Sequence, residues 1–128
     1  MGAWGIHFDE CDGSLDFLGD VEDRRDWSEI SHRIDDYVAN GGYDDAEETI
    51  AALELVAAAL GQPSERLKPE LIEWAKEYGS EAVTLRANAL TAIDLVRESS
   101  ELSELWAEAE ESDDWRTTLA DLRTRLTA

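Results

Sequence analysis

Four residues near the N-terminus form the densest group of potential transition-metal ligands in the sequence: His7, Asp9, Cys11 and Asp12. Their spacing matches no strong metal-binding signature, because the chain has no second cysteine and no histidine pair four positions apart. The structural alternative places His7 near the surface and buries Cys11 as a small apolar side chain. We therefore predict no metal site. The same arm is an alternative pocket for a small ligand, formed by Trp4, His7, Asp9 and Asp12.

His32 is the other candidate for proton transfer. General acid–base catalysis needs a cleft and a proton-transfer partner, and we expect His32 to lie on a helix surface near Asp35 or Asp36 instead. The sequence contains no serine-nucleophile motif, HExxH, P-loop or GxGxxG. We therefore predict a protein that is not an enzyme, with no catalytic residue and no cofactor.

Acidity is the strongest compositional signal. The chain has 31 Asp and Glu against 11 Lys and Arg, which gives a net charge of −20. Binding to nucleic-acid phosphates requires an excess of basic residues, so we expect no nucleic acid as a partner. A basic protein is the natural electrostatic complement. Adaptation to a salty cytoplasm would also explain the charge without any partner.

The acidic residues fall in clusters, and some of them lie at expected helix starts, where the helix dipole favours negative charge. This local role accounts for part of the excess and leaves two interpretations of the rest, a solvated surface or a face that binds a partner. The residues predicted for such a face are Asp20, Glu22, Asp23, Asp35, Asp36, Asp45 and Glu48.

The single cysteine, Cys11, permits no intramolecular disulfide and fits a reducing compartment. The first twenty residues lack the basic start and apolar run of a signal peptide. No apolar stretch approaches the roughly 20 residues of a membrane span. We therefore expect a cytoplasmic protein without a membrane partner, and the sequence leaves its oligomeric state open.

The segment from Thr49 to Leu60 is apolar on nearly every side, and Glu54 is its only charge. A helix with this pattern is usually buried among other helices. Other segments show apolar residues on one face at helical spacing. We expect helix caps at Ser14, Asp26, Asp44 and Ser80, a first-turn proline at Pro69 and a C-terminal glycine at Gly61.

These patterns predict an all-α fold, a compact single-domain bundle of about six to seven helices around the central Thr49–Leu60 helix. Residues 1–13 would form a short extended arm packed on this single domain of residues 1–128, because Trp4, Ile6 and Phe8 alternate. We expect Trp4 to be a buried structural plug, with an exposed recognition residue as the alternative.

The opening MGAWG, Phe8-Asp9 and the run from Leu15 to Leu18 resemble the start of an uncharacterised bacterial family, catalogued as domain of unknown function 4259. The resemblance continues through AALELVAAALGQP, from Ala51 to Pro63, and into the closing Leu and Trp pattern, so it spans essentially the whole chain. The chain departs from the family at Ile6-His7, where small residues are usual. The resemblance supports the domain boundaries and brings no activity, cofactor or catalytic residue.

Our first hypothesis is therefore a non-enzymatic protein-binding module whose acidic surface engages a basic protein. An immunity-type inhibitor of a basic toxin is its most concrete version. The second hypothesis is a small ligand- or metal-binding domain, or an enzyme, with a site at the N-terminal arm. The third is a structural domain whose acidity is an adaptation to salt.

Overall fold

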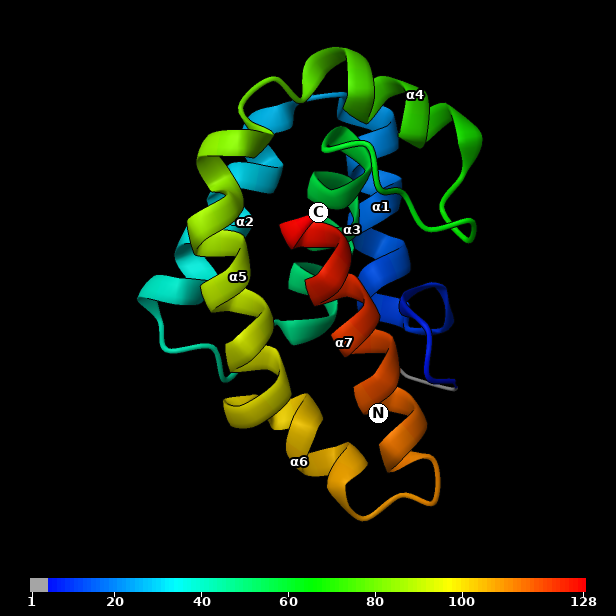
Figure 1. The fold of residues 1–128 in the computed structure, drawn as a ribbon, viewed down its shortest axis with the longest axis vertical. Coiled ribbons are helices and arrows are strands. Elements are labelled where there is room, and N and C mark those ends of the chain that lie inside the picture. The colour runs from blue at the N-terminus through cyan, green and yellow to red at the C-terminus, as the bar shows by residue number, and fades with distance from the viewer. Residues whose placement is uncertain (1–4) are drawn as a thin grey trace.

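Helix α3 (Ala46–Ala59) runs through the middle of the molecule, and each of the other helices packs against it (Figure 1). The computed structural model describes residues 5–128, so the expectations for Trp4 lie outside the described residues. Around α3 stand α1 (Asp12–Arg24), α2 (Trp27–Ala39), α4 (Pro69–Tyr78), α5 (Ala82–Ser99), α6 (Glu101–Ala107) and α7 (Ser112–Thr127). The described residues contain no β-strand, which confirms the predicted all-α fold.

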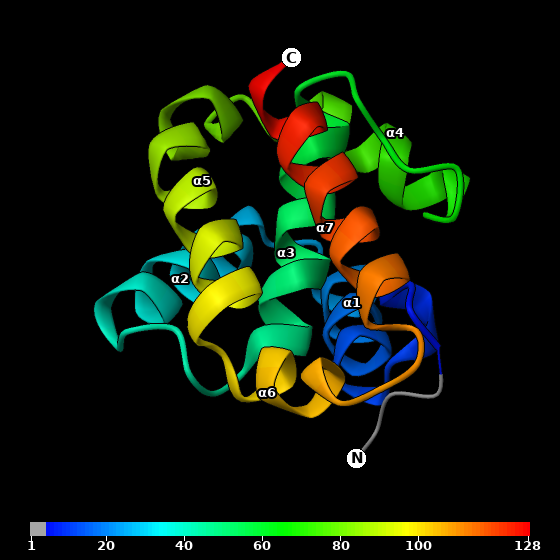
Figure 2. The same ribbon diagram turned by 60° about the horizontal axis from the view of Figure 1, so that its bottom comes forward.

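Figure 2 shows α3 between two pairs of helices, α2 with α5 on one side and α1 with α7 on the other. Helix α4 crosses one end of the bundle and the short α6 crosses the opposite end. The side chains of α3 from Thr49 to Ala58 are all buried. Its many alanines let neighbouring backbones approach closely, which is why one helix can pack against so many others.

Several helix ends follow from local sequence. The carboxylate of Asp26 accepts a hydrogen bond from the Ser28 N–H at 3.0 Å and so caps α2. Gly61 ends α3 with φ of 90°, while the Gln62 N–H donates to the carbonyl of Ala57 at 2.8 Å. This is the Schellman arrangement, in which glycine adopts the left-handed conformation at no steric cost. Pro69 occupies the first position of α4, as predicted.

Three predicted caps are wrong. Ser14 lies inside α1, Ser80 lies in a turn before α5, and α3 begins after Asp45 rather than Asp44. Neither Asp45 nor Glu81, the residues preceding α3 and α5, makes a side-chain cap hydrogen bond. In α1 the cap comes from another helix, because the Gly13 N–H donates to the Glu47 carboxylate at 2.9 Å.

The N-terminal arm is less extended than predicted. His7 and Cys11 have extended backbone angles, but residues Phe8–Glu10 between them form a 3-10 turn, η1. The turn buries Phe8 against the core and hydrogen-bonds the Glu10 N–H to the His7 carbonyl at 2.9 Å. The alternation of apolar residues therefore reflects a folded turn in this part of the arm and no strand.

Candidate functional site

Most of the acidic side chains have no basic neighbour. Ion pairs in residues 5–128 join seven of the 11 Lys and Arg side chains to eight of the 31 carboxylates. Ion pairing within this part of the chain therefore neutralises only a small share of the acidic charge.

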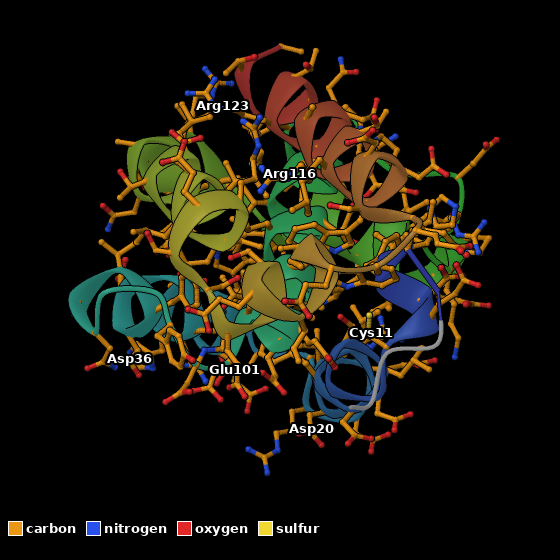
Figure 3. All side chains as sticks on the ribbon, turned by 90° about the horizontal axis from the view of Figure 1, so that it is seen from below. Cys11, Asp20, Asp36, Glu101, Arg116 and Arg123 are labelled. Atoms are coloured by element: carbon orange, nitrogen blue, oxygen red, sulfur yellow. The ribbon has the colours of Figure 1, made fainter. Side chains whose placement is uncertain are left out.

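The charges are also unevenly distributed between helices. Five of the nine arginines lie on α5 and α7: Arg86, Arg97, Arg116, Arg123 and Arg125. Figure 3 shows Arg116 and Arg123 on one side of the molecule and Asp20, Asp36 and Glu101 pointing outward on the opposite side, from α1, α2 and α6.

A groove of about 370 Å³ on this side is lined by residues of α6 and of the starts of α1 and α3. We call it the acidic groove. Among residues 5–128 no basic side chain lines it, although Arg33 lies 3.6 Å from the Asp45 carboxylate at its edge. Its carboxylates are those of Asp12, Asp45, Glu47, Glu48 and Glu101, and its apolar surface comes from Tyr43, Leu102 and Leu105.

Contacts between helices hold the carboxylates of the acidic groove in place. Glu47 accepts a hydrogen bond from the Gly13 N–H, and Ser14 Oγ donates to the Glu47 carbonyl at 2.6 Å. A side chain at Gly13 would meet the Glu47 and Glu48 carboxylates, so only glycine lets them lie this close to α1. Burial raises the pKa of Glu48, and the negative charges of Asp45 and Glu47 raise it further.

Of the seven residues predicted for a partner-binding face, two line the acidic groove. Asp45 and Glu48 line the acidic groove, and Asp45 also lies 3.6 Å from Arg33. The others lie elsewhere: Glu22 pairs with Lys68, Asp35 accepts a hydrogen bond from Asn88, and Asp20, Asp23 and Asp36 are exposed on α1 and α2. The prediction missed Glu47 and Glu101, because only the fold brings α3 and α6 together.

The predicted pocket at the N-terminal arm is divided among three cavities. Asp12 lines the acidic groove, and Asp9, held by Arg66 at 2.7 Å, lines a cavity of about 280 Å³. His7 lines a third cavity, of about 370 Å³, between the arm, α3, residues 64–66 and α7. We call this third cavity the N-terminal cleft. Among the residues that the structure describes, His7, Asp9 and Asp12 therefore each line a different one of these cavities.

Cys11 lines the N-terminal cleft but is poorly suited to nucleophilic chemistry. Its thiol is buried and lies 3.6 Å from the His7 carbonyl. Burial, followed by the charges of Glu47 and Glu10, raises the thiol pKa to about 12. The reactive thiolate is therefore scarce at neutral pH. Across residues 5–128, no three His, Cys, Asp or Glu side chains are grouped so that they could hold a metal ion.

Among these same residues, no helix combines the length and the apolar character needed to cross a bilayer.

Comparison with known proteins gives a family and no activity. A family model described as "Domain of unknown function (DUF4259)" matches residues 2–118. No curated protein and no solved structure matches the chain. The match covers nearly all of the 128 residues and confirms the resemblance found in the sequence. The chain therefore belongs to the family described as domain of unknown function DUF4259.

Proposed function

We propose that this protein is a non-enzymatic binding module that engages a basic protein through the acidic groove. One observation carries the proposal: the groove brings five carboxylates from α1, α3, α6 and the residue before α3 around an apolar surface, and Arg33, which contacts Asp45 at 3.6 Å, is the one basic side chain paired with any of them within residues 5–128. Charge of one sign in a hollow attracts and orients an oppositely charged partner. An immunity-type inhibitor of a basic toxin is the most concrete form of this function.

The apolar surface of the groove favours a protein partner over a simple cation. Leu105 is 47% exposed and Tyr43 is 46% exposed, so part of the groove's lining is apolar surface open to solvent. The aliphatic stem of an arginine or lysine can lie on such a surface while its charged head reaches a carboxylate. We therefore expect a partner segment that presents basic residues beside apolar ones.

Binding of a fluorescent peptide rich in Arg and Leu tests the proposal, with the same peptide carrying Glu in place of Arg as its control. A variant that combines Asp12→Asn, Glu48→Gln and Glu101→Gln removes three groove charges with little change in shape. We expect it to weaken binding of the basic peptide at least about tenfold, which corresponds to about 1.4 kcal/mol. Affinity should also fall steeply as salt rises.

The matched control combines Asp20→Asn, Asp23→Asn and Asp36→Asn, which removes the same charge outside the groove. We expect this control to change affinity less than about twofold, because exposed charges far from a contact act mainly through screened, long-range attraction. Equal weakening by both variants would show that net charge acts without the groove. If the basic peptide does not bind and KCl strongly raises the melting temperature, the acidity is an adaptation to salt.

A further inference from the structure

The N-terminal cleft contains a charged group that the fold alone does not explain. Glu54 is the only charged residue in α3 between Thr49 and Ala59, and only 4% of its surface is exposed. The Arg125 guanidinium binds it with two hydrogen bonds, at 2.8 and 3.1 Å. Apolar residues of similar volume usually stabilise a core as well as a buried ion pair does. A buried pair that lines a cavity is therefore a candidate for binding a ligand.

The charged side chains around the cleft determine whether a positively or a negatively charged ligand is attracted. Arg125 also binds Asp121 at 2.8 Å, so its one positive charge is shared between two carboxylates. Arg66, the other basic residue at the cleft, lies 2.7 Å from Asp9 and 3.7 Å from Glu10. The neighbouring carboxylates therefore outnumber the guanidinium groups. An anionic ligand would be repelled, and a cationic ligand would be attracted.

The walls of the cleft define the remaining chemistry of the ligand. Each Glu54 carboxylate oxygen accepts one hydrogen bond from Arg125, whereas a carboxylate can accept about four in all. The carboxylate can therefore take a further donor from within the cleft. Phe8, Ile50 and Leu122 supply an apolar lining, and the cleft volume of about 370 Å³ is in the range of small-molecule sites.

We propose that the N-terminal cleft is a second binding site, separate from the acidic groove, and that it takes a small organic amine. The ammonium group donates to Glu54, and the apolar body of the amine lies against Phe8, Ile50 and Leu122. Asp121, which shares Arg125 with Glu54, adds to the attraction. The site holds a ligand whether or not a basic protein binds the groove.

Benzylamine is a suitable probe, because benzyl alcohol and benzoate match its shape with neutral and negative charge. Titration of the full chain at physiological salt, followed by amide NMR shifts, should show saturable changes at Ile50, Glu54 and Leu122. We expect a dissociation constant of about 1 mM or tighter for benzylamine, given its small size. Benzyl alcohol should bind at least about tenfold more weakly, and benzoate should not bind.

Two variants locate the site. Glu54→Gln removes the charge and should weaken benzylamine binding at least about tenfold, whereas Glu101→Gln, in the acidic groove, should leave it unchanged. Thr117 is exposed and lines the cleft, so Thr117→Trp should obstruct the cleft and abolish binding without disturbing the core, even if Glu54→Gln does not fold. Unchanged binding in Thr117→Trp, equal binding of benzoate, or shifts confined to the acidic groove would each overturn the proposal.

Discussion

Arg125 is the single side chain that joins the most parts of this structure. Its guanidinium binds Glu54 in the central helix and Asp121 one turn earlier in α7, and it lies 3.4 Å from the Gln62 carbonyl. Its side chain is 16% exposed, so water screens these contacts only partly. Among the polar contacts of the described residues, those of Arg125 therefore contribute most to holding α7 against α3.

Replacing Arg125 with alanine should lower the free energy of unfolding by about 3 kcal/mol, because it leaves the buried Glu54 carboxylate without its cation. Urea denaturation followed by circular dichroism measures this loss. Arg123 provides the control, since its pair with Asp94 is largely exposed, and Arg123→Ala should cost at most about 1 kcal/mol. Equal losses in the two variants would mean that Arg125 contributes only as a surface charge.

At the scale of single residues, the sequence identifies the acidic side chains but not the side chains that they contact in the fold. Glu54 stands out in the sequence as the one charge in the central helix. Its partner lies 71 positions away, and no local spacing reveals that contact. The same limit applies to Glu47 and Glu101, which meet in the acidic groove only because α3 and α6 pack together.

At the scale of the helix, replacing glycine by alanine should have opposite effects on stability at two positions. Gly19 lies inside α1, where an added Cβ would meet nothing within 4 Å. Gly61 also has open space around it, but its φ of 90° is a conformation that other residues rarely adopt. Any difference between alanine substitutions at these two sites therefore arises from backbone conformation rather than from a clash.

Gly19→Ala should raise the free energy of unfolding by about 0.5–1 kcal/mol, because alanine favours the helix and restricts the unfolded chain. Gly61→Ala should lower it by about 1–2 kcal/mol, because alanine is strained in the left-handed conformation. Thermal unfolding of the two variants and the parent measures both effects. A stabilising Gly61→Ala would contradict the Schellman end of α3.

The helices themselves were predictable because their apolar periodicity and several of their ends are local properties. Asp26, Gly61 and Pro69 mark ends that depend on residues within one or two turns. The prediction at Ser14 is wrong because α1 begins at Asp12 and its first turn is capped by Glu47 from α3, a contact between residues 34 positions apart. Tyr78 and Val83 are 58% and 65% exposed near the end and the start of their helices, so an apolar residue at a helix end need not be buried.

At the scale of the whole molecule, the excess of negative charge and the buried carboxyls both make the folded chain less stable as the pH rises. Burial raises the pKa of Glu48, and it also raises the pKa of Glu54, where the hydrogen bonds and charge of Arg125 oppose it. A carboxyl whose pKa is higher in the folded chain than in the unfolded chain binds more protons when folded. Its contribution to stability is therefore lost as pH rises above the unfolded value of about 4.3. Repulsion among the remaining carboxylates also weakens as they become protonated.

We therefore expect the melting temperature to rise as the pH falls from about 7 to about 5, the direction set by carboxyls with raised pKa values. Calorimetry over this range measures the effect. Asp26, whose pKa is lowered by its hydrogen bonds to Ser28, acts in the opposite direction but is exposed. Glu48→Gln should reduce the slope, and a melting temperature that falls throughout this range would contradict the expectation.

The hydrogen bond from the Gly13 amide to Glu47 ties the first turn of α1 to a carboxylate of the acidic groove. Two donors would compete for the Glu47 carboxylate, because a guanidinium bound in the groove would draw it away from the Gly13 amide. Under the proposed function, occupancy of the groove would be transmitted to the backbone at the beginning of α1. The Gly13 proton is a natural reporter, whose rate of exchange with solvent records whether the groove is empty or filled.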